Sequence, residues 1–204
     1  GPRACSRLAV AVEPLATRGS IRHWLALKPL VGVVLPGLIL LGFVYLAFVP
    51  KAAPKTVETT VSGRLLIGTA APDFTTEGLG GDTVRLSQFR GHPVLINFWA
   101  TWCTACRTEM PAIEQAWERY RGRGFQVIAV DYQESNTTAM RTFLSTLGVR
   151  FVAALDTQGK IAAAYNVTVG LPTSIFVGRD GVARTIHLGQ MSATFLDQQV
   201  QAVL

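Results

Sequence analysis

The sequence predicts an α/β domain with a mixed sheet, and three observations support this fold class. Two largely apolar runs of strand length, residues 94–99 and 125–130, are each followed by a stretch with helical periodicity. A hairpin pattern over residues 174–188 and a final helical stretch come after them. Alternating strands and helices followed by a hairpin are typical of a mixed sheet that is covered by helices.

The first predicted elements surround a central strand. Residues 83–86 follow a Gly-Gly-Asp turn, which predicts the return strand of a hairpin. Residues 94–99 are typical of a central strand that is covered on both faces. Residues 104–121 have helical spacing, and Pro111 is expected only to kink this helix. The predicted inward stripe of the helix consists of Cys106, Glu109, Ile113, Ala116, Trp117 and Tyr120.

The second half of the predicted domain continues the alternation. Residues 125–130 predict another buried strand, which ends at Asp131. Residues 137–147 predict a helix that stops at Gly148. The remaining predicted elements are a hairpin formed by residues 174–177 and 182–188 and a closing helix over residues 193–204.

The net charge of +6 comes entirely from the first 55 residues. They carry seven Lys or Arg against one Glu, whereas residues 56–204 carry twelve charges of each sign. A neutral domain has no net positive field with which to gather phosphates. We therefore expect no nucleic-acid partner.

Residues 30–49 form an uncharged, largely apolar run of 20 residues. As a helix rising about 1.5 Å per residue, this run spans the roughly 30 Å core of a bilayer. A cleaved signal peptide and a buried core helix are the alternatives. The run exceeds the roughly 7–15 residues of the apolar core of a usual signal peptide. The best candidate cleavage site, the small residues Ala52-Ala53, is followed by Pro54, which makes it a poor position for cleavage. The sequence predicts an uncleaved single-pass transmembrane helix.

The charges that flank this run predict its orientation. Five basic residues precede it and two follow, which keeps residues 1–29 in the cytoplasm and sends the domain to the periplasmic side of the cell membrane. Residues 50–64 contain two prolines and no apolar stripe, which predicts a linker. Residues 65–204 are the predicted folded domain, and by this topology Cys5 is expected on the cytoplasmic side, across the membrane from it.

Cys103 and Cys106 stand between the strand 94–99 and the helix 104–121. The first sulfur is expected at the helix N-terminus, where unpaired amides and the macrodipole favour a thiolate. The second lies one turn further in, placed to attack the first once that one is bonded to another sulfur. The pattern predicts a redox-active dithiol, with Cys103 partly exposed and Cys106 buried.

Two other interpretations of the cysteine pair are weaker. A structural disulfide across two intervening residues closes a tiny loop and removes little entropy from the unfolded chain. A zinc site needs about four ligands, and only His92 and His187 stand near the predicted fold. We therefore expect no metal and no cofactor other than the disulfide itself.

Residues 97–106 (Asn-Phe-Trp-Ala-Thr-Trp-Cys-Thr-Ala-Cys) resemble the active-site segment of the thioredoxin superfamily. Residues 71–74, 86–91, 107–111 and 170–174 resemble the membrane-tethered, extracytoplasmic branch, which includes ResA and TlpA proteins and the cytochrome c maturation thioredoxins. The resemblance covers about residues 65–204. It implies a thioredoxin fold with an extra N-terminal β-hairpin.

The chain departs from that branch in two places. Ala105 stands where a proline often precedes the second cysteine, and this dipeptide helps to set the redox potential. The maturation proteins often carry a glutamate after the loop proline, where this chain has Thr173 and Ser174, so the ResA/TlpA type is favoured.

The resemblance implies roles for two carboxyl groups. Glu109 falls on the inward stripe three residues after Cys106, where burial raises the pKa of a carboxyl, and it is expected to relay the proton that Cys106 loses. The alternative is a solvated acid that favours the helix N-terminus. Glu134, in the loop after the strand 125–130, matches a second acid of the family.

The resemblance also implies the walls of the site. Pro172 is expected to follow a cis peptide bond and to face the two sulfurs, although cis bonds are only about 5–6% of X–Pro bonds in general. Leu171 would then keep its backbone free to pair with an extended substrate, as in strand addition. Trp102 is expected to shield the sulfurs and to contact partners.

Together these features predict a membrane-tethered thiol–disulfide oxidoreductase that reduces protein disulfides. The resemblance implies a membrane electron donor of the CcdA or DsbD kind. It also implies substrates such as the haem-binding cysteine pairs of apocytochromes c or the copper-site cysteines of oxidase assembly factors. A copper-handling module and a disulfide oxidase are the alternatives. A peroxide-reducing enzyme is disfavoured, because Ala100 occupies the threonine place of the Pro-x-x-x-Thr-x-x-Cys pattern.

Overall fold

The computed structural model describes residues 38–42, 44–45, 57–168 and 170–204. Most of the predicted anchor and all of residues 1–29 lie outside these ranges. Within the described part of the chain, no helix has the length and apolarity needed to cross a membrane. The chain divides into two units, residues 1–54 and 55–204, and the second unit is described below.

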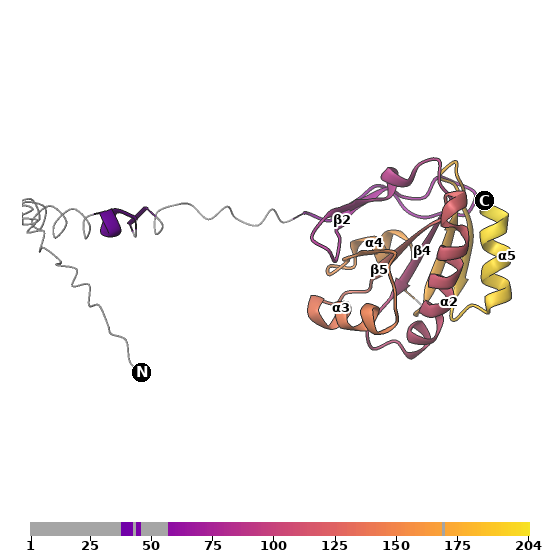
Figure 1. The fold of residues 1–204 in the computed structure, drawn as a ribbon. Helices are drawn as coiled ribbons and strands as arrows, with labels where there is room; N and C mark the ends of the chain where they lie inside the picture. The colour runs from indigo at the N-terminus through magenta and orange to yellow at the C-terminus, as the bar shows by residue number, and fades with distance from the viewer. Residues whose placement is uncertain (1–37, 43, 46–56, 169) are drawn as a thin grey trace, which may run out of the picture. The chain divides into compact units, whose positions relative to one another are not determined.

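A mixed sheet of five strands, in the order β6-β5-β4-β7-β8, forms the centre of this unit (Figure 1). Parallel pairing joins β4 to β5 and β5 to β6, whereas β7 pairs antiparallel with both β4 and β8. The predicted mixed sheet is therefore confirmed. The strands are β4 (Val94–Trp99), β5 (Gln126–Asp131), β6 (Val152–Ala154), β7 (Thr173–Val177) and β8 (Ala183–Leu188).

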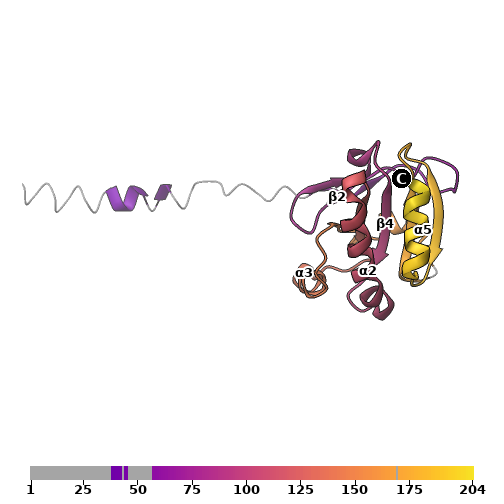
Figure 2. The same cartoon turned by 45° about the vertical axis from the view of Figure 1, so that its right-hand side comes forward.

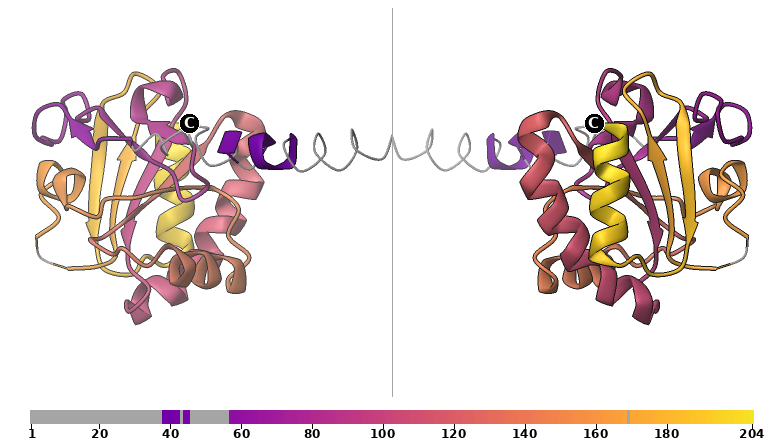
Figure 3. Two further views of the ribbon diagram at one scale, coloured as in Figure 1. Left: turned by 90° about the vertical axis from the view of Figure 1, so that its left-hand side faces the viewer. Right: turned by 90° about the vertical axis from the view of Figure 1, so that its right-hand side faces the viewer.

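Two long helices lie side by side on one face of the sheet, as both views in Figure 3 show. They are α2 (Thr104–Tyr120) and α5 (Ala193–Val203). Asp197 of α5 joins them, because it accepts hydrogen bonds from Arg119 at 3.0 Å and from the Tyr120 hydroxyl at 2.6 Å. The remaining helical segments are α3 (Thr137–Thr146), α4 (Lys160–Ala164) and the 3₁₀ turns η2 (Leu86–Phe89) and η3 (Arg121–Arg123).

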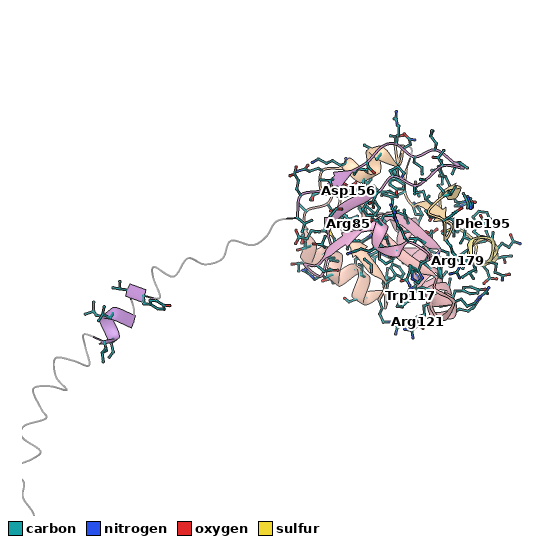
Figure 4. All side chains as sticks on the ribbon, turned by 90° about the horizontal axis from the view of Figure 1, so that it is seen from above. Arg85, Trp117, Arg121, Asp156, Arg179 and Phe195 are labelled. Carbon is teal, nitrogen blue, oxygen red and sulfur yellow. A yellow bond between two sulfur atoms is a disulfide. The ribbon has the colours of Figure 1, made fainter. Side chains whose placement is uncertain are left out.

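The predicted stripe of α2 is largely confirmed. Its buried residues are Cys106, Glu109, Met110, Ile113, Glu114, Ala116 and Tyr120. Trp117 was predicted on the stripe but is only half-buried. The Arg121 guanidinium lies over its ring, 5.3 Å from the ring centre, and Figure 4 labels both side chains. Pro111 lies inside α2, which runs on to Tyr120.

A second, smaller sheet precedes the central one in the chain and carries the predicted hairpin. It consists of β1 (Thr60–Val61), β2 (Phe74–Glu77) and β3 (Thr83–Arg85), all paired antiparallel. Figure 2 shows β2 beside the central sheet. The hairpin of β2 and β3 is confirmed, but β1 falls inside residues 50–64, which were predicted as a linker. Pairing with β2 gives this short segment the backbone hydrogen bonds that make it a strand.

The central strand β4 separates two apolar cores. Leu95 and Trp99 pack into the core beneath α2, α3 and α5. Ile96 and Phe98 point the other way, into the core shared with α4 and the small sheet. All six residues of β4 are buried, as expected for a strand with covered faces. This double burial fixes the end of β4, from which the chain passes directly into the functional site.

Substituting Ile96 tests how much β4 contributes to stability. Ile96 is fully buried, and it pairs with Ile175. We expect Ile96→Ala to lower the free energy of unfolding by about 2–5 kcal/mol, because a cavity replaces the buried side chain. Ile186 pairs with the other side of Ile175 but is 38% exposed. Ile186→Ala should therefore cost much less in urea unfolding of the full chain, and equal losses would contradict this account of the core.

Candidate active site

Cys103 and Cys106 form a disulfide, with 5.2 Å between their Cα atoms. They lie where β4 ends and α2 begins, and Cys103 is the N-cap residue of α2. The Cys106 N–H donates to the Cys103 sulfur at 3.1 Å. When the bond is reduced, the same amide and the positive end of the helix dipole stabilise a Cys103 thiolate.

Both sulfurs are shielded from solvent. Cys103 is 6% exposed and Cys106 is 1% exposed, so the predicted burial of Cys106 is confirmed. The prediction that Cys103 is partly exposed is wrong for this disulfide form. As the N-cap residue, Cys103 is bonded inward to Cys106 and packs with the core beneath the helices. Trp102, the residue before it, is 66% exposed and presents its indole to solvent.

The cis peptide bond between Leu171 and Pro172 is confirmed. Thr173, the next residue, pairs with Phe98 of β4, so the proline lies at the same edge of the sheet as Cys103. The Pro172 carbonyl accepts the Gly189 N–H at 2.8 Å. Within the described residues, the Leu171 backbone makes no backbone hydrogen bond, which leaves it able to pair with another extended chain.

Glu109 is a buried carboxyl on α2, one turn after Cys106 and 2% exposed. Its Oε1 accepts from Asn97 Nδ2 at 2.9 Å, and its Oε2 accepts from the Met191 N–H at 2.7 Å. Burial raises its pKa from 4.5 to about 7, although both hydrogen bonds act in the opposite direction. The alternative of a solvated helix-terminal acid is therefore excluded, and the inward position is confirmed.

The spacing of Glu109 along the helix places it beside Cys106. Side chains three residues apart on a helix are neighbours, with about 5–6 Å between their Cβ atoms. A carboxyl that titrates near neutral pH can both take a proton from a thiol and return it. The fold thus holds a protonatable carboxyl inside the core, one helical turn from Cys106.

Glu134 holds the loop that leads into the cysteines. Its Oε2 accepts the Thr101 N–H at 2.6 Å, and its other oxygen accepts the Thr101 hydroxyl. Its own N–H donates to Asp131 Oδ2 at 2.9 Å. Because Thr101 is two residues before Cys103, the carboxylate of Glu134 fixes the backbone next to the first sulfur.

Asp131 is a buried carboxyl that the sequence interpretation missed, since it was taken only as the end of a strand. It is 1% exposed. Burial raises its pKa to about 7, and the nearby charge of Glu134 adds to the effect. Asp131 pairs with Trp99 across β4 and β5, and this pairing places it beside the site. The pairing depends on the register of the sheet, which local sequence does not show.

The two histidines weighed as ligands do not join the cysteines. His92 contacts the Gly124 carbonyl at 3.2 Å and precedes β4, whereas the cysteines follow it. The His187 ring packs on Phe195 of α5, with 4.6 Å between ring centres. Among the residues that the structure describes, no group of three or more His, Cys, Asp or Glu is arranged to hold a metal ion.

The fold and this site define a class, the thioredoxin-like thiol–disulfide oxidoreductases. Comparison with known proteins gives the family, because the model of the AhpC/TSA family matches residues 67–186. The chain belongs to this family. The resemblance to thioredoxin-like oxidoreductases of the ResA type is likewise confirmed by the similar proteins that follow.

A thiol-disulfide oxidoreductase ResA from Bacillus thuringiensis subsp. konkukian is 31% identical over 144 residues, which are 71% of this chain and 82% of that protein. A crystal structure from Chlorobium tepidum, assigned as a thiol:disulfide interchange protein DsbE, superposes with a TM-score of 0.63 at 36% identity, over 68% of this chain and 98% of that one. A secreted Mycobacterium tuberculosis disulfide oxidoreductase, homologous to Escherichia coli DsbE, superposes with a TM-score of 0.58 at 27% identity, over 63% of this chain and 95% of that one.

The raised pKa of Glu109 predicts a pH-dependent stability. The folded protein holds this proton up to about pH 7 and the unfolded chain only to about 4.5, so stability is lost as the pH rises through this window. Relative to Glu109→Gln, the free energy of unfolding of the wild-type chain should fall by about 3 kcal/mol between about pH 4 and pH 8.

Urea unfolding of the disulfide form at several pH values measures this difference. Asp131 titrates in both proteins, so its contribution cancels. Glu118→Gln, which removes a half-exposed carboxyl of the same helix, is the matched control for the loss of a carboxyl from α2. A constant difference for Glu109→Gln would show that Glu109 is not titrating in the fold.

Proposed function

We propose that this protein is a membrane-tethered reductase of protein disulfides that acts on the periplasmic side of the cell membrane. The observation that carries the proposal is a disulfide at the N-terminus of α2 with a protonatable, buried carboxyl one turn below it. The first cysteine is suited to attack and the second to resolve. Glu109 is suited to move the proton between them.

The reaction follows thiol–disulfide exchange. The Cys103 thiolate attacks one sulfur of a substrate disulfide, a mixed disulfide forms, and the other substrate sulfur leaves as a thiolate. Cys106 gives its proton to Glu109 and attacks the Cys103 sulfur, which releases the second substrate thiolate. Two electrons have passed from the dithiol to the substrate, and the Cys103–Cys106 disulfide of the structure is the product.

The substrate side of the proposal rests on the Leu171 backbone, for which no backbone hydrogen bond is found within the described residues. This residue lies at the cysteine edge of the sheet and is half-buried, so an extended peptide can add to it as a short strand. The exposed indole of Trp102 offers an apolar contact beside it. We propose the haem-binding cysteine pairs of apocytochromes c, which the family resemblance implies, as the substrate.

The compartment is inferred from the sequence and from relatives. Residues 30–49 are long and apolar enough to anchor the chain, and the similar M. tuberculosis protein is secreted. Disulfides persist outside the cytoplasm, where a reductase needs electrons from inside. We propose a membrane donor of the CcdA or DsbD kind to reduce the Cys103–Cys106 bond after each turnover.

Removing the resolving thiol should trap the substrate. On a Cys5→Ser background, the mixed disulfide on Cys103 cannot be resolved in Cys106→Ala and should accumulate. Cys103→Ala, whose remaining thiol is the buried Cys106, should form far less of it. An oxidised peptide with a Cys-x-x-Cys-His segment, mixed with the full chain and separated by non-reducing electrophoresis, measures the adduct. A matched peptide without this segment should form less of it. Equal trapping of the two peptides would contradict the cytochrome substrate, and no adduct with any disulfide would contradict the reductase.

Neutralising Glu109 should slow the resolving step. General-base assistance is worth about 10²–10⁴-fold, so Glu109→Gln should lower the rate of resolution in stopped-flow exchange by at least about tenfold. Glu114→Gln is the matched control, because this buried carboxylate of the same helix binds Arg150 instead. The wild-type rate should rise with pH through about 7, where Glu109 ionises. A Glu109→Gln rate that keeps this rise would remove Glu109 from the mechanism.

A further inference from the structure

Asn97 ties three elements together beneath the disulfide. Its Nδ2 donates to Glu109 of α2 and to Ser174 Oγ of β7, each at 2.9 Å. Asn97 itself belongs to β4, is 1% exposed and pairs directly with Ser174 in the sheet. Both hydrogens of its amide are therefore used, one on each neighbour.

The other end of the same amide has no partner. Within the described residues, Asn97 Oδ1 is buried and accepts no hydrogen bond. A buried polar atom without a partner is uncommon and costs free energy. In this orientation the amide is thus complementary to its neighbours through Nδ2 only. A half-turn would exchange the two Nδ2 hydrogen bonds for others, whereas Oδ1 has no hydrogen bond to lose.

Glu109 requires two different neighbours in its two charge states. As a carboxylate it only accepts, which suits the Asn97 Nδ2 and the Met191 N–H. When protonated it must also donate one O–H. The Met191 N–H is a backbone donor and cannot reverse, so the proton belongs on Oε1, which faces Asn97. With Nδ2 in that place, a donor would face a donor.

We propose that Asn97 is a positioning residue whose side-chain amide turns by half a rotation each time Glu109 gains or loses its proton. In the turned orientation, Oδ1 takes the place of Nδ2 and accepts the Glu109 O–H. Oxygen and nitrogen of an amide are nearly equal in size, so the turn needs no repacking.

Ser174 completes the exchange of partners. Its hydroxyl both donates and accepts, so it receives a hydrogen bond from Nδ2 in one state and donates one to Oδ1 in the other. In each charge state, Glu109 is then hydrogen-bonded to Asn97, and Asn97 is hydrogen-bonded to Ser174. Ser174 is two residues after Pro172. This series of hydrogen bonds therefore ends close to the segment that we propose for substrate pairing.

The groups around Glu109 restrict what else could respond to its proton. Cys106 is the neighbour on α2, and it can titrate only after the disulfide is reduced. His187 of β8 pairs with Ser174 on the side away from Asn97. Asn97 and Ser174 face Glu109 from β4 and β7, and the Met191 N–H faces it from the segment before α5. These last three carry no charge. Because the Met191 N–H can only donate, a change in hydrogen-bond direction is open to Asn97 and Ser174 alone.

The wild-type protein provides the direct test, which rests on the proton relay proposed above. In the full chain with its disulfide intact, ¹³C NMR of labelled glutamate follows the Glu109 carboxyl, and ¹H–¹⁵N NMR follows the Asn97 side-chain NH₂. Above the Glu109 midpoint, we expect nuclear Overhauser cross-peaks between this NH₂ and the Ser174 β-hydrogens. Below the midpoint they should be lost, and their intensity should follow the carboxyl titration.

The outcomes separate the two proposals. A Glu109 that titrates near pH 7 while the cross-peaks persist overturns the turning amide and leaves the relay standing. A Glu109 that does not titrate between about pH 5 and pH 9 overturns the relay, and the turning amide with it.

Variants give a second reading. Asn97→Ala removes the hydrogen-bond partner of both charge states of Glu109. The bond to the carboxylate is charge-assisted and therefore stronger than the bond from the neutral O–H, so the Glu109 midpoint should rise by about half to one pH unit. The carboxylate fraction at pH 7, and with it the resolving rate, should then fall about two- to fivefold. Ile96→Val, a neighbouring core substitution that points to the opposite face, should leave the midpoint unchanged. An unchanged midpoint in Asn97→Ala overturns the proposal.

Discussion

The site depends on one constraint: a carboxyl group is kept inside an apolar core, one helical turn below a disulfide. In water Glu109 would be ionised at neutral pH and would offer little driving force to take a proton from a thiol. Burial raises its pKa to about 7, where a carboxyl can gain and lose a proton with small changes in its surroundings. Two hydrogen bonds, from Asn97 and Met191, stabilise the ionised carboxylate and so limit the rise of its pKa. The fold thus sets the pKa of Glu109 through two opposing effects, burial and hydrogen bonding.

The rest of the fold brings its partners to the same edge of the sheet. Parallel pairing places the ends of β4 and β5 together, so the cysteines after β4 meet the acidic loop after β5. Antiparallel pairing with β4 places the beginning of β7, and hence Pro172, at this edge as well. Glu134 then fixes Thr101 by two hydrogen bonds. The cysteine pair, the buried Glu109 and the segment at Pro172 therefore converge although they come from distant parts of the chain.

Local patterns predicted much of this arrangement. The apolar run at β4 and the helical stripe of α2 placed the cysteines at a strand–helix junction and put Glu109 on the inward face. Short elements were missed. β6 and α4 span only three and five residues, which are too few to reveal the hydrophobic period of a strand or a helix in the sequence. The hydrogen bond between Asn97 and Ser174 joins residues 77 apart in sequence, and no local pattern reports such a contact. The burial of Cys103 likewise depends on how the whole core packs around the disulfide.

The reduction potential of the Cys103–Cys106 couple, measured against pH, tests the central claim most directly. Reduction places thiols beside Glu109, and a thiolate disfavours a neighbouring carboxylate, so the carboxyl should hold its proton to higher pH in the reduced protein. One additional proton is then taken up on reduction above about pH 7, and the potential should fall more steeply there, by about 30 mV per pH unit, than in Glu109→Gln. Parallel curves for the two proteins would show that the buried carboxyl and the dithiol do not exchange protons, which would contradict the account.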